Sequence, residues 1–255
     1  MKIAWDNRWD TATLTTGSEI ATLPGTNVQK PHLSRKWHTA AGVKASNQIA
    51  DMGAAVSISL GGLFGTNLTA AATVRWRAST LDPNVVNNLL LDTGVVNAGV
   101  KAGYGQSIKS WNAVAARYWR VDPDDATVPD NLQIGRIFAG PSWTHQKALT
   151  YGWGITPYDP SPVEKSRGGQ SYPDALPKYR IGEFALDYLT EAEIYDNLFA
   201  LARANGVVKD ALAIPFESGA YLSEQAIWGL VQPYEPVVHR LTLTYRQKFR
   251  IEERL

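Results

Sequence analysis

The chain of 255 residues contains no cysteine. This absence excludes disulfides, thiolate metal sites and a cysteine nucleophile. Charge is also scarce, because charged residues make up 19% of the chain and the formal net charge is only +1. So small a charge provides no field to attract nucleic acid or an acidic membrane surface. We therefore expect neither nucleic acid nor a membrane among the partners of this protein.

Long apolar runs are missing as well. No segment approaches the roughly 18 consecutive apolar residues that span a bilayer. Residues 1–8 have no apolar core of signal-peptide length. The sequence predicts a globular protein that is made and folded without secretion.

Familiar catalytic motifs are equally absent. The sequence has no Gly-x-Ser-x-Gly elbow, no His-Glu-x-x-His and no phosphate loop ending in Gly-Lys-Ser/Thr. The glycine-rich segment 103–107 lacks the lysine and the helix of a phosphate cradle, so we predict an inter-strand loop there. Of the four histidines only His32 and His38 are close, at a spacing that does not suit zinc. We predict a protein that is not an enzyme and has no cofactor or metal.

Acidic residues leave two alternatives open. The run at 122–125 could supply oxygen ligands to Ca²⁺, although its Asp-Pro start favours a solvated turn. Paired carboxylates for glycoside hydrolysis can come together from distant parts of a chain. The presence of 24 acidic residues therefore does not decide for or against such a pair.

Alternation with a period of two dominates the sequence and indicates strands. Val74 and Trp76 share one face of segment 73–78. Near the C-terminus, alternation continues from 240 to 251, with only Gln247 interrupting the apolar face formed by Leu241, Leu243, Tyr245, Phe249 and Ile251. We expect one strand there, about twice the usual ~5–6 residues, covered by a partner sheet. Its basic face is a solvated surface or a docking site for an acidic neighbour, and includes Arg240, Arg246, Lys248 and Arg250.

One helix, 191–205, is well marked. Thr190 is a suitable N-cap, Glu193 completes a capping box and Gly206 provides a left-handed stop. The spacing of Ile194, Leu198 and Leu201 gives the helix an apolar face, which we expect to pack on the C-terminal strands.

Proline and glycine mark the irregular segments. Residues 157–162 contain three prolines and are predicted to lack regular structure, and residues 166–173 are predicted to form an exposed loop. We place a domain boundary near Gly140.

Nine tryptophans are present. Trp76 and Trp119 lie in alternating segments and are predicted to be core residues. Four others fall in less regular sequence and could cover a subunit interface, where aromatic residues are enriched: Trp5, Trp9, Trp143 and Trp153.

Three segments carry a resemblance to a known fold. Residues 47–56 contain an Ile-x-Asp-Met-Gly turn entering a strand, residues 115–121 read Ala-Ala-Arg-Tyr-Trp-Arg-Val, and residues 134–140 form a closing strand. This order resembles the discoidin or galactose-binding-like β-sandwich. The resemblance implies a mainly β protein with a jelly-roll sandwich over 1–140, and recognition or assembly rather than catalysis. Residues 141–255 then form a second, β-rich assembly region containing the helix.

In galactose-binding-like domains, the loops at one end of the sandwich carry the ligand site. The resemblance therefore makes Arg35, Trp37 and His38 candidate binding residues that could stack on a sugar ring and hydrogen-bond to it. The alternative for Trp37 is a core plug beneath the sandwich.

A second resemblance covers nearly the whole chain. Residues 5–7, 23–37, 135–140 and 245–255 are similar in order to structural proteins of tailed-bacteriophage tails, particularly the distal tail or baseplate. It implies a virion subunit, assembled in the host cytoplasm, in a homo-oligomeric ring that joins the tail tube to the tip and contacts other tail proteins. Six copies are preferred to three. The competing prediction is a carbohydrate-binding module that contacts a host glycan.

Overall fold

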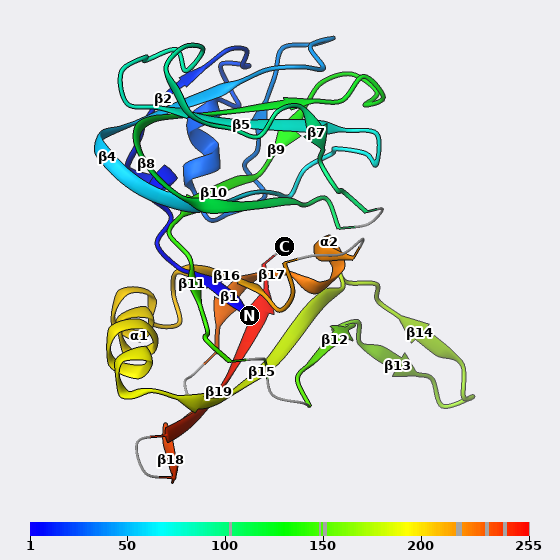
Figure 1. Cartoon of the computed structure of the whole chain (residues 1–255). Coiled ribbons are helices and arrows are strands. Elements are labelled where there is room, and N and C mark those ends of the chain that lie inside the picture. Colours follow the sequence, from blue (N-terminus) through cyan, green and yellow to red (C-terminus); the bar gives the residue numbers. More distant parts are fainter. Residues whose placement is uncertain are drawn as a thin grey trace. The chain divides into compact units, whose positions relative to one another are not determined.

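The computed structural model describes residues 1–101, 104–147, 149, 152–217, 221–232, 235–241 and 244–254. The chain divides into two compact units, one of residues 1–144 and 212–226, the other of residues 145–211 and 227–255. Both units consist mainly of antiparallel strands (Figure 1), so the mainly β fold class is confirmed. The first unit includes a late segment, 212–226, which the sequence patterns do not separate from its surroundings.

The first unit is built on an antiparallel sheet with the strand order β10–β4–β8–β5–β6. Its strands are β4 (Gln48–Phe64), β5 (Thr73–Ser79), β6 (Leu89–Asp92), β8 (Ser107–Asp124) and β10 (Arg136–Gly140). In addition, β2 (Thr13–Thr16) pairs with β4, and β7 (Val96–Asn97) pairs with β5. The long strands β4 and β8 curve through the unit (Figure 1), so that one end of β4 pairs with β2 and the other with β10.

Shorter elements complete this unit. The strands β3 (Trp37–His38) and β9 (Gln133–Ile134) form a separate pair. The strand β1 (Lys2–Ala4) pairs with β11 (Trp143–Thr144) and with residues 212–214 of β16 (Asp210–Ile214). The helical turns are η1 (Arg8–Thr11), η2 (Gly25–Gln29) and α2 (Leu222–Gln225).

Tryptophans fill the core of the first unit. Trp76 and Trp119 are fully buried, which confirms their predicted place in the core. Trp9 is also fully buried, meets Trp76 edge to face at 5.8 Å between ring centroids, and donates to Gln48 Oε1 over 2.9 Å. The prediction that Trp9 covers a subunit interface is therefore wrong, because η1 turns its ring onto the sheet.

The Asp51–Gly53 segment, predicted to be a turn, lies inside β4. The pairing of β4 with β8 shifts register between Asp51 and Val56, and Gly53 has φ of +74°. Asp51 accepts the Gly53 amide at 2.8 Å and forms a bidentate ion pair with Arg117 of β8. The segment is a β-bulge because both flanking parts of β4 keep pairing with β8. The predicted strand at 115–121 is confirmed as part of β8. The predicted closing strand at 134–140 is divided, because Ile134 ends β9 and residues 136–140 form β10.

In the second unit, the strand order is β17–β19–β15–β12, with β18 beside β19. The bounds are β12 (Gly154–Tyr158), β15 (Tyr179–Leu189), β17 (Ile227–Val231), β18 (Val238–Leu241) and β19 (Thr244–Glu253). The hairpin of β13 (Val163–Lys165) and β14 (Ser171–Pro173) is a separate pair, exposed throughout and projecting in Figure 1.

The predicted helix is confirmed, as a π-helical segment η3 (Glu193–Leu198) continuing into α1 (Phe199–Asn205). Thr190 and Glu193 form the predicted capping box: the Thr190 amide donates to Glu193 Oε2 at 3.0 Å, and the Glu193 amide donates to Thr190 Oγ1 at 3.3 Å. Gly206 ends the helix at φ of +52°. The apolar side chains of the helix are buried: Ile194, Leu198 and Leu201.

Predictions about three segments of the second unit are wrong in part. Residues 171–173 of the predicted loop 166–173 form β14. The expected single C-terminal strand is an antiparallel pair, β18 and β19, with Leu241 opposite Thr244. No glycine or proline in the segment 240–251 signals this division into two strands, and residues 242–243 and 255 lie outside the described residues. The segment 157–162 is partly regular, since Pro157 pairs within β12, a strand with one hydrogen-bonded neighbour, where a missing amide donor is tolerated.

Along β19 the alternation is otherwise as predicted, with Gln247, Phe249 and Ile251 buried, and Lys248 and Arg250 exposed. Among the described residues, no helix has both the length and the apolar character needed to span a bilayer.

Candidate functional site

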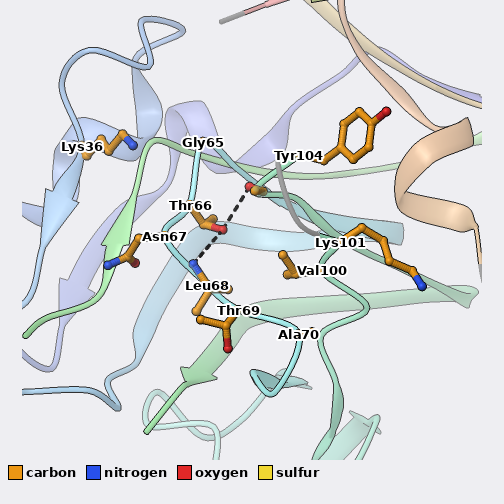
Figure 2. A pocket seen from close by; sticks show the side chains of 11 residues that line it. Lys36, Gly65, Thr66, Asn67, Leu68, Thr69, Ala70, Val100, Lys101 and Tyr104 are labelled. Atoms are coloured by element: carbon orange, nitrogen blue, oxygen red, sulfur yellow. Dashed lines mark hydrogen bonds between the residues drawn. The ribbon is translucent and has the colours of Figure 1, made fainter. Parts of the chain in front are cut away.

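An open pocket of about 500 Å³ lies in the first unit (Figure 2). Its walls are the loop 65–70, between β4 and β5, and the loop that precedes β8, with Lys36 from just before β3. The described residues that line it are Lys36, Gly65, Thr66, Asn67, Leu68, Thr69, Ala70, Val100, Lys101, Tyr104 and Gly105. The pocket therefore depends on segments that are far apart in the sequence.

Thr66 holds the two loops together. Its amide and its Oγ1 both donate to the carbonyl of Gly105, at 2.9 Å and 3.0 Å. Gly105 has φ of +55°, and a Cβ at this position would lie 2.6 Å from the Thr66 carbonyl oxygen. Only glycine allows this close approach without a shift of the backbone.

The far side of the 65–70 loop is fixed to the body of the unit. Asn67 donates to the Asn131 carbonyl at 2.8 Å and accepts the Gln133 amide at 2.8 Å. The Thr69 amide donates to Asp125 Oδ2 at 2.6 Å. Because these polar groups are satisfied within the protein, the loop is preorganised and a ligand does not have to order it.

The opposite wall is supported by α2. Ser223 Oγ donates to the Gly99 carbonyl, and Gln106 Nε2 donates to the carbonyls of Ser223 and Ala226. The Lys101 ammonium lies 5.8 Å from the centroid of the Tyr221 ring, a cation–π distance. The late segment of the first unit thus holds the loop that carries Lys101.

The lining combines three kinds of group. Val100 and Leu68 are buried and apolar, and Tyr104 exposes 38% of its surface. Lys36 and Lys101 supply ammonium donors, and the described lining contains no aspartate, glutamate or histidine. Figure 2 shows Lys36 on one side and Tyr104 on the other, with Val100 below them. An aromatic face, an apolar floor and polar donors suit a ligand that has both C–H faces and oxygen acceptors.

Two titratable groups beside the pocket have shifted pKa values. Burial raises the pKa of Asp125, but hydrogen bonds from Thr127 and Thr69 outweigh it, and the net shift is downward. Burial and the nearby charge of Lys36 lower the pKa of His38. Asp125 therefore stays ionised, and His38 stays neutral, over a wider pH range than usual.

The structure separates the three residues that the sequence suggested for binding. Trp37 is buried, and its Nε1 donates to the Ser18 carbonyl at 2.9 Å, so it is the core plug and its ring is not available for stacking. Arg35 is exposed and His38 is half-buried. None of the three lines the pocket, but their neighbour Lys36 does.

The sequence did not identify the remaining lining residues as binding residues. Tyr104 and Gly105 fall in the segment predicted to be an inter-strand loop, whose first residue, Gly103, lies outside the described residues. The sequence signal for a binding site here is a tyrosine beside a glycine in a loop. This signal is weak unless one knows which other loop lies opposite.

The acidic run at 122–125 is not a solvated turn. Asp122 is in β8 and pairs with Arg77 at 2.7 Å and with Arg120 at 2.8 Å. Asp125 is buried and accepts hydrogen bonds from Thr127 and Thr69. Within the described part of the chain, no cluster of three metal-ligating side chains occurs.

Comparison with known proteins gives a partial likeness. No protein-family model and no curated protein matches the sequence. A chitosan-binding module of a chitosanase/glucanase from Paenibacillus sp. IK-5 is similar at 17% identity and a TM-score of 0.43, over 53% of this chain and 99% of the module. A Streptococcus pneumoniae fucose-binding module is similar at 12% identity and a TM-score of 0.42, over 53% and 95%.

A further similar structure is a Clostridium perfringens module solved with GalNAc-β-1,3-galactose. It has 11% identity and a TM-score of 0.44, over 54% of this chain and 100% of the module. Each of these likenesses covers about half of the chain.

Proposed function

We propose that this chain is a non-catalytic carbohydrate-binding protein whose ligand occupies the pocket between the 65–70 loop and Tyr104. The observation that carries the proposal is the lining itself: a partly exposed aromatic ring and two lysines around an apolar floor, on loops fixed by internal hydrogen bonds. The C–H face of a sugar packs on the ring, and its hydroxyl oxygens accept from Lys36 and Lys101.

Binding rather than hydrolysis is proposed because the described lining supplies no carboxylate or imidazole. Glycoside hydrolysis requires a pair of acidic groups beside the bond that is cleaved. The Asp125 carboxylate, which bonds the amide of the lining residue Thr69, is already engaged by threonine donors.

A glycan array probed with the purified full chain tests the proposal, followed by calorimetric titration with the glycan that binds best. We expect Tyr104→Ala to weaken binding about fivefold, since stacking contributes on the order of 1 kcal/mol and about 1.4 kcal/mol corresponds to tenfold. Tyr172→Ala is the matched control, because Tyr172 is also exposed but lies in β14. Absence of glycan binding, or equal affinity of Tyr104→Ala and the native chain, would refute the proposal.

The virion role remains a prediction, and it requires the chain to oligomerise. A ring subunit must form closed homo-oligomers, whereas the pocket consists of residues from a single chain. Localisation in a phage tail and contact with other tail proteins depend on that role and are tested with it.

A further inference from the structure

A second cavity, of about 290 Å³, lies within the second unit. The described residues that line it are Asp187, Tyr188, Arg240 and Thr244. They come from the end of β15 and from the two strands of the β18–β19 hairpin. This cavity plays no part in the function proposed above.

Tyr188 has an unusual backbone conformation. Its φ is +59°, a value that a bulky side chain rarely adopts. The pairing of β15 with β19 shifts register between Leu186 and Leu189, both of which are fully buried, while Tyr188 exposes 60% of its surface. The bulge therefore anchors both flanking leucines in the core and presents the tyrosine ring to solvent at the cavity. Strain of this kind persists only where the surroundings enforce it, and it is concentrated at functional sites.

A buried histidine, His145, holds the backbone of Tyr188 in this conformation. His145 Nε2 lies 3.2 Å from the Asp187 carbonyl oxygen, and its Nδ1 lies 3.0 Å from Glu193 Oε1. Glu193 is fixed in turn by the Thr190 capping box. The N-terminus of the helix thus holds the peptide that precedes Tyr188.

The Asp187 side chain is buried beside the cavity, and its Oδ1 makes no hydrogen bond. The side chain is 8% exposed, and Oδ1 lies 3.3 Å from Arg240 Nη1 and 3.2 Å from Arg246 Nε. Neither contact has hydrogen-bond geometry, and no other donor among the described residues reaches Oδ1. A buried carboxylate oxygen without a donor is costly. Oδ1 itself is inaccessible to solvent, so the ion pairs with Arg240 and Arg246 are what compensate its charge.

The charged partner of Asp187 is accessible from outside. The Arg240 side chain is 50% exposed, so its remaining N–H groups can donate to a bound molecule. A guanidinium donor and an exposed aromatic ring thus border one cavity. The oxygens of a sugar match the donor, and the C–H face of its ring matches the aromatic ring.

We propose that this cavity is a second saccharide site, independent of the pocket in the first unit. Sugar oxygens accept from the exposed N–H groups of Arg240, and the ring of the sugar packs on Tyr188. The β15 bulge is the device that positions Tyr188 for this contact.

The test is a ¹H–¹⁵N NMR titration of the full chain with galactose, glucose, N-acetylglucosamine and glucuronate at millimolar concentrations. We expect at least one sugar to shift the amide signals of Asp187, Tyr188 and Thr244. Because shifts are read residue by residue, a failure here is distinguishable from a failure at residues 65–70 and 104–105.

Variants separate a binding role from a structural one. Tyr188→Gly should weaken sugar binding at least tenfold without lowering the melting temperature, because glycine adopts positive φ freely. Tyr188→Phe should bind within about twofold of the native chain, and Arg240→Ala should bind at least tenfold more weakly. Tyr172→Ala, an exposed tyrosine of the same unit, should leave the titration unchanged. No sugar-induced shift at 187–188, or native affinity in Tyr188→Gly, would overturn the proposal.

Discussion

Gly105 shows how much of the pocket depends on one residue. A side chain at this position meets the Thr66 carbonyl at 2.6 Å and also requires φ of +55°. Gly94 has a similar φ, +66°, but a Cβ there would touch nothing within 4 Å. The two glycines therefore separate the cost of the backbone conformation from the cost of the close contact between the loops.

We expect Gly105→Ala to lower the free energy of unfolding by about 2–3 kcal/mol, because it combines strain with a clash. Gly94→Ala should cost only about 1 kcal/mol, from strain alone. Urea denaturation of both variants measures the difference. An equal loss of unfolding free energy in the two variants would show that the loops move apart at the Gly105–Thr66 contact with little loss of stability.

At the core, Trp119 should be among the most sensitive residues. It is fully buried, and its Nε1 donates to the Ala116 carbonyl at 3.1 Å. We expect Trp119→Ala to cost about 3–5 kcal/mol by leaving a large cavity, and Trp119→Phe to cost less. Thermal denaturation measures this, and an unchanged melting temperature in Trp119→Ala would contradict the burial of this ring.

Among the elements, the helix that begins at Thr190 has the clearest local cause. We expect Thr190→Ala to cost about 1 kcal/mol through loss of the cap, and Thr190→Ser to cost little because serine also caps. The free energy of unfolding from chemical denaturation is the measure. A loss of similar size in both variants would show that the methyl group, not the hydroxyl, matters at this position.

The 65–70 loop should respond to acid. The folded pKa of Asp125 is below its ordinary value, so its hydrogen bonds stabilise the fold fully above a pH of about 4, the unfolded pKa. This contribution is lost as the pH falls through the folded pKa. We expect amide exchange at Thr69 to accelerate on acidification relative to the intrinsic rate, and Asp125→Asn to remove most of that pH dependence. Equal pH profiles in the two proteins would contradict the prediction.

The same elements show why some of this structure follows from the sequence. The helix, its cap and its stop involve residues three or four positions apart, and the burial of Trp76 and Trp119 follows from simple alternation. The division of the C-terminal segment into β18 and β19 interrupts no sequence pattern, and the Asp51–Gly53 bulge resembles a turn in sequence because bulges and turns both favour glycine at positive φ. The pocket was not predictable, since it exists only where loops some 35 residues apart meet.

For the whole molecule, the state of association decides between the two roles. The tail prediction requires a stable ring, with six copies preferred, and its interfaces should each bury more than ~1,000 Å². Light scattering after size exclusion measures the mass directly. A monomer that binds glycans would favour the recognition role alone, whereas a six-chain ring would support the tail prediction and leave the pocket free to act within it.

The interleaved order of the two units has a consequence for synthesis. When the ribosome has synthesised residues 1–144, every strand of the β10–β4–β8–β5–β6 sheet is present but α2 is not. The loop before β8 depends on α2, which supports it through Ser223 and Gln106. The complete second-unit segment 145–211 must be synthesised before that support appears. During this part of synthesis, the loop before β8 lacks its support from α2. A fragment that ends at Thr144 should therefore form the sheet but bind sugar weakly.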